Sequence, residues 1–324
     1  MSPVASLSLD LDNKWSFLKT HGDESWRSFP SYLSLVVPTV LSFADEGDLT
    51  MTVFVVGQDA ELDVNAEALG QLGRSRHEIG NHSFYHEPWL HLKSKREIEA
   101  EISRATEAIV AATGKRPLGF RGPGFSLSQP TIEVLAKSGY QYDATTLPTW
   151  IGPLARAFYF KSATMGSDEM EKRDRLFGSF GDVLQPIKPY QWMVPGTTRL
   201  LEIPVTTMPF LRVPIHATYL LYLAQYAESL SRAYLNSAIR LCRLTGTDLS
   251  FLLHPLDFLG GDDVDELSFF PGMSMRGDTK RRLVGEYLEA IRSSFDMVPM
   301  SDHADMISLR NLRSRPAARL APQS

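Results

Sequence analysis

The sequence predicts an α/β fold, a parallel β/α barrel in a single domain that carries an insertion. Short apolar runs alternate with helix-like stretches along the chain, as in repeated β/α units. With 324 residues, 43% of them hydrophobic, the chain can bury a full core. Acidic residues and histidines follow several of the apolar runs. Because the active sites of β/α barrels lie at the C-terminal ends of the strands, these polar residues are the first candidates for a site.

Residues 5–9 alternate between apolar and small polar side chains and predict the first strand. Such a strand would deliver Asp10 and Asp12 on the same side at its C-terminal end. A solvated pair of surface acids is the alternative. The interleaved Leu9 and Leu11 count against it, because they indicate a strand with one buried face.

His82 and His86 are four residues apart, which would place both on one face of a helical turn. Both imidazoles could then reach a single ion. Two histidines and a carboxylate leave a coordination position of zinc open for water, which is typical of catalytic sites. For an isolated pair of this spacing, ordinary surface or core histidines are about as good an interpretation.

Two further segments present polar residues after apolar steps. Residues 119–125 carry Arg121, and the glycines that follow it would let the loop approach a ligand closely. An ordinary turn is the alternative. Residues 249–253 predict a buried strand that presents His254 at its edge, where a core histidine is the alternative.

The remaining elements follow the same alternation. Residues 49–56 predict a second strand, and a capping box of Ser94 and Glu97 starts a helix that ends at Gly114. A helix over 131–138 and a strand that reaches Asp143 come next.

In this order the segments resemble the polysaccharide deacetylase superfamily, also known as the NodB-homology domain or carbohydrate esterase family 4. Its motifs run Asp-Asp, His-Ser-x-x-His, Arg-x-Pro, Asp and Leu-His, and residues 82–86 match the second in full. The resemblance covers about residues 5–146 and 248 to the late 290s. It implies a distorted (β/α) barrel of the NodB-homology type with a cap-like insertion. The first motif is Asp-x-Asp, as in the branch with allantoinase-like and deformylase-like members.

The resemblance implies one group of residues around a metal. Asp12, His82 and His86 would be the ligands of a divalent cation, with zinc as the first choice and cobalt, manganese or iron as alternatives. Asp10 would be the general base that takes a proton from the attacking water, and Arg121 would orient it.

A second group would act on the leaving amine and the oxyanion. His254 matches the general acid, and Asp143 matches the carboxylate that orients and charges it. The backbone N–H of Gly124 or of Phe125 would stabilise the oxyanion. The third motif, Arg-Gly-Pro-Gly-Phe, leaves the choice between them open, and the fourth lacks the tryptophan that often follows its Asp.

The chain divides into four expected segments. Residues 1–146 would form the first part of the barrel with the metal site, and 147–247 an insertion or cap that includes a barrel strand at 202–207. Residues 248–310 would complete the barrel, and 311–324 would be a disordered tail. Within the insertion, the helical stretch 216–244 would pack the cap onto the barrel. The alternative is an apolar groove for a polyprenyl or acyl chain, with Trp150 and residues 158–160 nearby.

Composition limits the partners and the compartment. A net charge of -5 gives no basic footprint for nucleic acid. No apolar run is long enough to span a bilayer, so an integral membrane protein is not expected, whereas peripheral contact stays open. Cys242 is the one cysteine, which fits a reducing compartment. The short stretch before the first strand leaves no room for a signal peptide, so a cytoplasmic protein is expected. The sequence does not determine the oligomeric state.

The leading hypothesis is a metal-dependent amidohydrolase that removes an N-acetyl or N-formyl group from an amino sugar. The sugar could be free, nucleotide-linked or lipid-linked, as in glycan or glycolipid assembly. One alternative is an allantoinase-like hydrolase of a small non-sugar amide or ureide. The other is a non-catalytic carbohydrate-binding protein, which would be expected to have lost at least one ligand, base or acid.

Overall fold

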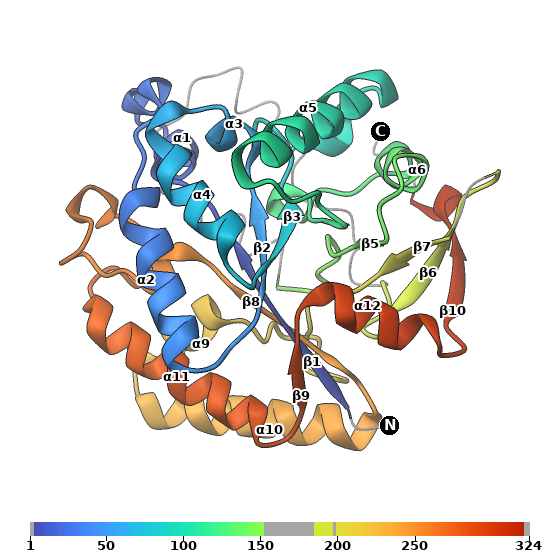
Figure 1. Ribbon diagram of the computed structural model, residues 1–324. Coiled ribbons are helices and arrows are strands. Elements are labelled where there is room, and N and C mark those ends of the chain that lie inside the picture. Colours follow the sequence, from blue (N-terminus) through green and yellow to red (C-terminus); the bar gives the residue numbers. More distant parts are fainter. Residues whose placement is uncertain (1–2, 152–184, 197–198, 321–324) are drawn as a thin grey trace.

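A single curved sheet forms the centre of the computed structural model, which describes residues 3–151, 185–196 and 199–320 (Figure 1). The strand order among these residues is β10-β6-β7-β5-β4-β3-β2-β1-β8, and β9 also pairs with β1. The pairings between these strands are parallel except that of β6 with β7, which is antiparallel. The strands are Val4–Asp10 (β1), Thr52–Val55 (β2), Glu78–Asn81 (β3), Gly119–Phe120 (β4), Tyr142–Asp143 (β5), Tyr190–Met193 (β6), Leu200–Glu202 (β7), Leu249–Leu253 (β8), Asp296–Val298 (β9) and Arg313–Pro316 (β10).

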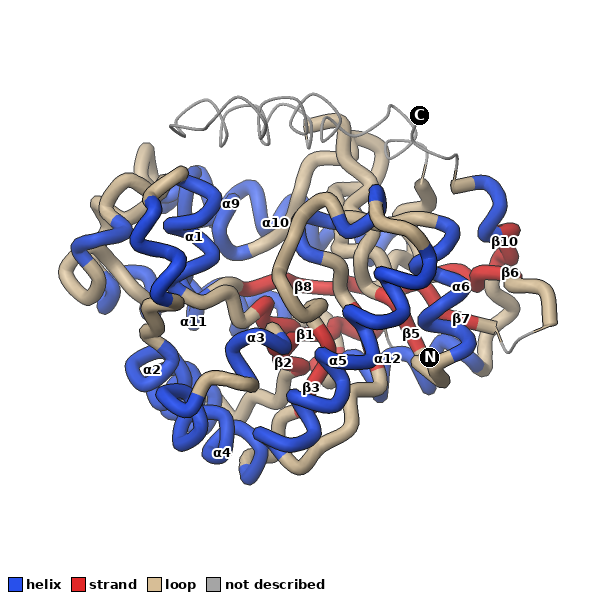
Figure 2. The backbone as a smooth tube through the Cα atoms, turned by 90° about the horizontal axis from the view of Figure 1, so that it is seen from above, coloured by secondary structure: helices blue, strands red, loops and turns tan. Residues whose placement is uncertain are grey.

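The sheet closes toward a barrel between β8 and the segment that follows β7. Thr206 N donates to Ser250 O at 3.1 Å, and Ser250 N donates to Thr206 Oγ1 at 2.6 Å. Seen from above, β1, β2, β3 and β8 lie in the interior among the helices, whereas β6 and β10 lie near the right-hand edge (Figure 2). The expected α/β barrel architecture is therefore confirmed.

Helices cover the outside of the sheet. They are Lys14–His21 (α1), Leu33–Glu46 (α2), Gly57–Ala60 (α3), Ala66–Arg74 (α4), Lys95–Thr113 (α5), Gln129–Lys137 (α6), Ala217–Ala224 (α9), Glu228–Thr245 (α10), Gly277–Arg292 (α11) and Met300–Ser308 (α12). The predicted capping box of α5 is present, with Ser94 and Glu97 satisfying each other's backbone N–H groups. Gly114 ends this helix in the left-handed conformation, as predicted.

The first strand differs from the prediction in its burial. All seven residues of β1 are buried, so the strand has two covered faces and not one. The reason is its place in the sheet, because β1 lies between β2 and β8 and parallel strands in barrels are covered on both sides. Leu9 and Leu11 both belong to the main hydrophobic core.

The region expected to be an insertion or cap is in part barrel. After β7, the helices α9 and α10 form the crossover that leads to β8, and their buried leucines join the main core. A strand was expected at 202–207, but the observed strand β7 lies earlier in the chain, at Leu200–Glu202. The helical stretch is interrupted at residues 225–227. Residues 158–160, which were considered as part of an apolar groove, lie outside the described residues.

The C-terminal segment also departs from the prediction. Disorder was expected from residue 311, but Arg313–Pro316 forms β10, which pairs with β6 in parallel. Ala317 is buried in a second hydrophobic cluster beside Tyr190 and Trp192. Residues 321–324 lie outside the described part of the chain. None of the described helices combines the length and the apolar character needed to cross a membrane.

Candidate functional site

The strand register brings the candidate residues to one rim of the barrel. Asp10 ends β1, while His82, Arg121 and His254 directly follow β3, β4 and β8. Parallel pairing aligns these ends: Leu9 pairs with Leu253, and Asn81 pairs with Phe120. Residues far apart in sequence therefore meet at the C-terminal end of the sheet, as expected for a β/α barrel.

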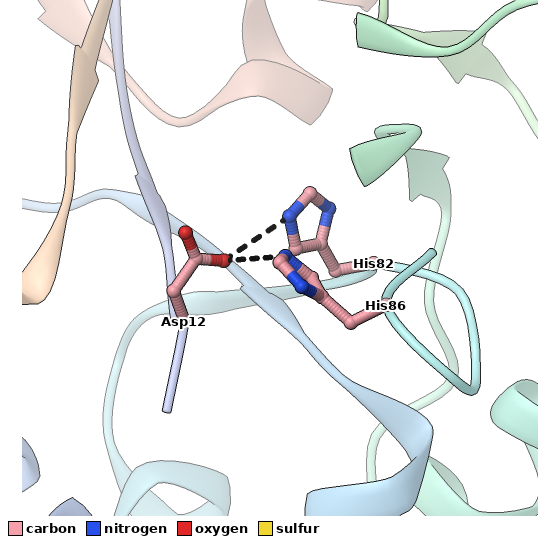
Figure 3. Close-up of side chains that lie close together, drawn as sticks. All are labelled: Asp12, His82 and His86. Atoms are coloured by element: carbon pink, nitrogen blue, oxygen red, sulfur yellow. Dashed lines mark ion pairs between the residues drawn. The ribbon is translucent and has the colours of Figure 1, made fainter. Parts of the chain in front are cut away.

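Asp12, His82 and His86 converge on one point (Figure 3). Asp12 Oδ1 lies 2.8 Å from His86 Nε2 and 3.4 Å from His82 Nε2. One ligand atom from each residue lies within 4.8 Å of the other two, which is close enough for all three to contact a common ion. The predicted association of these three residues is present in the structure.

The histidine pair does not lie on a helical turn, however. His82 and His86 belong to a loop after β3 in which Ser83 and His86 have positive φ angles of 61° and 51°. Asn81 Oδ1 accepts a hydrogen bond from Ser83 N at 2.8 Å and holds the start of the loop. The helical prediction was wrong because loop conformation, set by tertiary contacts, can bring two side chains together as well as helical spacing can.

The orientation of His82 is set by a backbone carbonyl. His82 Nδ1 lies 2.7 Å from Arg121 O. Since a carbonyl only accepts, Nδ1 carries the proton, and Nε2 lies on the Asp12 side of the ring, where it could bind an ion. Ligand histidines in metal sites are typically oriented in this way.

The electrostatics of this cluster favour a cation. Burial lowers the pKa of His82, but the carboxylates of Asp10 and Asp12 outweigh it and raise the pKa overall. Burial acts to raise the pKa of Asp12, but the interactions with His82 and His86 outweigh this effect. The pKa of Asp12 is therefore far below its usual range. Asp12 Oδ1 is buried and makes no hydrogen bond of acceptable geometry. Two imidazole nitrogens and this carboxylate oxygen fit a divalent metal with open positions.

Asp10 lies beside the three candidate ligands and is paired with Arg121. The guanidinium donates to Asp10 Oδ1 at 2.8 Å and to Ser8 Oγ at 2.9 Å, while Asp10 Oδ2 is 4.0 Å from His82 Nε2. Arg121 is fully buried and also donates to Ala144 O at 3.0 Å. A buried ion pair needs such additional hydrogen bonds to be stable, and they fix the direction of the Asp10 carboxylate.

The two candidate oxyanion donors lie in a tight turn after β4. Phe125 N donates to Gly122 O at 3.1 Å, so this amide is already engaged within the turn. Gly124 has a φ of +58°, and a Cβ on it would lie 2.8 Å from Pro88 Cβ. Its backbone therefore packs closely against the loop that follows His86. Gly124 stays a prediction as an oxyanion donor.

Asp143 makes no hydrogen bond or ion pair to His254 in the described part of the chain, and its expected role stays a prediction. It accepts a hydrogen bond from Thr145 Oγ1 at 2.5 Å, and its register partner across the sheet is Glu202. Burial and Glu202 raise the pKa of Asp143 well above its usual range. Glu202 itself accepts from Thr146 and from Trp192 Nε1, the latter at 2.8 Å. Asp143 thus belongs to a buried carboxyl pair between β5 and β7.

The carboxyl group beside His254 is Asp257. His254 Nδ1 lies 3.9 Å from Asp257 Oδ2 and 3.1 Å from Thr218 Oγ1. Asp257 is three residues from His254, which was a weak signal because that spacing also suits a turn cap. Thr218 lies 36 residues upstream on α9, so the sequence offered no signal for it.

Asp59 is another residue that motifs did not reveal. Its Oδ1 accepts from Asn13 Nδ2 at 2.7 Å and from Trp15 Nε1 at 2.8 Å, and the Trp15 ring meets the edge of His86. Burial raises the pKa of Asp59 to about 7. Asp59, which lies in α3, therefore holds the segment after Asp12 by hydrogen bonds to Asn13 and Trp15.

Comparison with known proteins gives consistent results. Residues 23–142 match a family model described as polysaccharide deacetylase, a stretch that contains His82, His86 and Arg121. A peptidoglycan deacetylase of Helicobacter pylori is 31% identical over 107 residues, which are 33% of this chain and 36% of the relative. The matched stretch is thus only about a third of either protein.

A similar fold occurs in a crystal structure from Mycobacterium smegmatis, of a protein assigned as a polysaccharide deacetylase. The TM-score is 0.62 at 20% sequence identity, over 97% of this chain and 96% of the other. At this identity the likeness concerns the fold, and it extends over nearly the whole of both chains.

Proposed function

We propose that this chain, which matches the polysaccharide deacetylase family over residues 23–142, is a metal-dependent amidohydrolase that removes an N-acetyl or N-formyl group from an amino sugar. One observation carries the proposal. Three candidate ligands, Asp12, His82 and His86, converge beside a carboxylate, Asp10, that an arginine holds in place. Metal-assisted amide hydrolysis uses this combination of an ion and a positioned base.

A divalent cation held by the three ligands would lower the pKa of a bound water and polarise the acyl carbonyl. Asp10 takes the proton of the attacking water through Oδ2, because Oδ1 is bonded to Arg121. The water oxygen bonds to the acyl carbon. Arg121 keeps Asp10 oriented and balances its charge in the buried site.

His254 acts on the leaving group. The C–N bond breaks only if the poor amine leaving group receives a proton, which the imidazolium of His254 supplies from Nε2. His254 follows β8, whose last residue pairs with Leu9 next to Asp10. The acid and the base therefore come from neighbouring strands of the barrel rim.

Zinc is the metal we propose, since two histidines and one carboxylate suit it. The same set also accepts cobalt, manganese or iron, so the loaded metal has to be measured. We propose an acylated amino sugar as substrate, because the similar Helicobacter pylori protein is named a peptidoglycan deacetylase. Whether the sugar is free, nucleotide-linked or lipid-linked is part of the test.

The test is acetate and formate release from a panel of N-acyl amino sugars, free, nucleotide-linked and polyprenyl-linked, by zinc- and cobalt-loaded protein. His82→Ala serves as the blank. His21→Ala is the matched control, because its imidazole stacks on Phe269 at 3.7 Å and belongs to no candidate ligand set. Release that His82→Ala abolishes and His21→Ala retains would support the proposal. If sugars stay intact while allantoin-like amides are cleaved, the small-amide hydrolase replaces it, and metal-loaded protein that binds sugars without turnover would be a binding protein.

We also propose that the protein works in the cytoplasm. Its one thiol, Cys242, is buried in the core and needs no oxidising compartment. Cell fractionation with an antibody against the protein would test this, and recovery outside the cytoplasm would overturn it.

A further inference from the structure

The surroundings of His254 contain a hydrogen-bonded chain that no motif predicts. Thr218 Oγ1 lies 3.1 Å from His254 Nδ1, and Asp257 Oδ2 lies 3.9 Å from the same nitrogen. His254 N donates to Asp257 Oδ2 at 2.7 Å. Asp257 is 1% exposed, so its carboxyl group depends on these partners for hydrogen bonds.

The direction of the hydrogen bonds follows from the donors available. The carboxylate of Asp257 only accepts, and its Oδ2 lies 3.9 Å from His254 Nδ1, so its negative charge favours a proton on that nitrogen. The proton on Nδ1 is donated to the Thr218 oxygen, which lies 3.1 Å away and can accept it. The proton that the imidazolium can give away is therefore the one on Nε2.

The structure also explains why Asp257 stays in place. Lys280 of α11 is buried and donates to Leu256 O at 2.7 Å and to Leu259 O at 2.8 Å. These hydrogen bonds connect the turn that contains Asp257 with α11, a helix on the outside of the barrel. Burial raises the pKa of Asp257, while His254, Thr218 and Lys280 all act in the opposite direction.

His216 lies close by without competing for the role of acid. Its ring centroid is 6.4 Å from that of His254. Burial and the charge of His254 lower the pKa of His216 to about 3, so it stays neutral when His254 is protonated. Its Nδ1 accepts from Tyr219 N at 3.4 Å at the start of α9, the helix that carries Thr218. His216 thus caps this helix.

We propose that Thr218 and Asp257 are positioning residues that hold His254 with its proton on Nδ1, so that Nε2 faces the leaving nitrogen. The proposal gives these two residues the task that the sequence suggested for Asp143, and it rests on the proposed amidohydrolase function. In the step itself, Nε2 gives its proton to the departing nitrogen as the C–N bond breaks. The imidazole is left neutral, with Nδ1–H still donated to Thr218.

The first experiment measures turnover with two kinds of substrate. Thr218→Val removes the hydroxyl but keeps the shape, and we expect it to lower kcat for the N-acetyl sugar about tenfold or more at nearly unchanged KM. An activated aryl acetate needs no proton on its leaving group, so its hydrolysis should fall less than about threefold. Thr218→Ser should restore amide turnover. Equal losses for both substrates would overturn the proposal in favour of a structural role.

The control variant is Thr39→Val on α2. The hydroxyl of Thr39 donates only within its own helix, to Leu35 O at 2.7 Å, so both activities should stay unchanged. Asp257→Asn tests the same group of hydrogen-bonded residues. Like Thr218→Val, it should lower turnover of the amide more than turnover of the ester.

The second experiment does not depend on activity. Nitrogen-15 spectra of histidine-labelled, metal-free protein distinguish the two tautomers of a neutral ring, and His254→Gln identifies the resonance. We expect an Nδ1–H tautomer in the wild type and a mixture in Thr218→Val. If this holds but no acyl sugar is hydrolysed, the proposed function fails while the tautomer assignment stands. An Nε2–H tautomer in the wild type would refute the positioning role whatever the activity.

Discussion

Asp10 and Asp12 are two positions apart, yet their neighbours assign them different tasks. Asp10 is bonded to the buried guanidinium of Arg121, whereas Asp12 faces His82 and His86. A carboxylate held by an arginine is suited to accept a proton, and one that faces two imidazoles is suited to bind a cation. The identity of the neighbours, more than that of the residue, decides the role.

This difference predicts distinct losses for two substitutions. Asp12→Ala should abolish both metal binding and turnover, because it removes the carboxylate that lies 2.8 Å from His86 Nε2 and 3.4 Å from His82 Nε2. Asp10→Asn should keep the metal and lower kcat by about 10²–10⁴-fold, the usual contribution of a general base. Metal content after dialysis and acetate release check both outcomes. An Asp10→Asn protein that cannot hold metal would reassign Asp10 as a ligand.

His77 predicts a pH dependence of stability. It accepts a hydrogen bond from Met51 N at 3.3 Å through Nδ1, and burial lowers its pKa from 6.5 to about 4. The unfolded chain protonates His77 at a higher pH than the folded protein does. The neutral His77 therefore contributes its full share to the free energy of unfolding above about pH 6.5. This contribution declines as the pH falls toward 4. Urea midpoints between pH 7 and 4 should therefore fall less steeply in His77→Gln, and parallel curves would contradict the prediction.

At the scale of elements, the loop that carries the two histidines rests on α5. Tyr85 N donates to Glu101 Oε1 at 3.3 Å, and Gly57 of α3 packs against Ala105 and Phe84. A stable α5 is therefore a condition for the position of His82 and His86. The two ends of α5 can be predicted from the sequence, because the capping box and the terminal glycine are local signals.

The contact between α4 and α5 gives a matched pair of glycine substitutions. A Cβ on Gly73 would lie 2.1 Å from Thr113 O, which is backbone, while one on Gly70 meets only the flexible end of Arg74 at 3.2 Å. Gly73→Ala should destabilise the protein by more than ~1 kcal/mol, because the two helices must separate. Gly70→Ala should be neutral or stabilise by up to ~1 kcal/mol through helix propensity. Urea midpoints compare the two, and equal effects would refute the close packing.

At the scale of the whole molecule, the chain end completes the sheet. Arg313–Pro316 adds β10 at the edge beside β6, and the guanidinium of Arg315 lies 5.6 Å from the ring centre of Tyr190. The polar, arginine-rich sequence of this segment is typical of a disordered tail. It is ordered here because its backbone pairs with β6 and Ala317 is buried, neither of which leaves a local pattern.

Truncation tests this arrangement. Ending the chain after Leu312 removes β10 and the buried Ala317, so we expect a clear loss of stability and exposure of the cluster around Tyr190 and Trp192. Ending it after Leu320 removes none of the described contacts and serves as the control. Urea unfolding followed by tryptophan fluorescence measures both, and equal midpoints would mean that β10 contributes little.

Much of this protein can be predicted from its sequence alone. The α/β barrel, the strand that ends at Asp10, the capped helix at Ser94 and the polar residues at the strand ends are all determined by patterns within short windows. The association of Asp12, His82 and His86 was also expected, because the family resemblance implied it and parallel strands bring their C-terminal ends to one rim.

Other features were decided only by the tertiary structure. The loop conformation of His86, the pairing of Asp143 with Glu202, and the placement of Thr218 and Asp257 beside His254 depend on contacts between segments distant in sequence or on backbone angles that spacing does not encode. The physical reason is that motifs record residue types along the chain. Which carboxyl group meets which imidazole is fixed by packing across the barrel, where burial and hydrogen bonding act between elements.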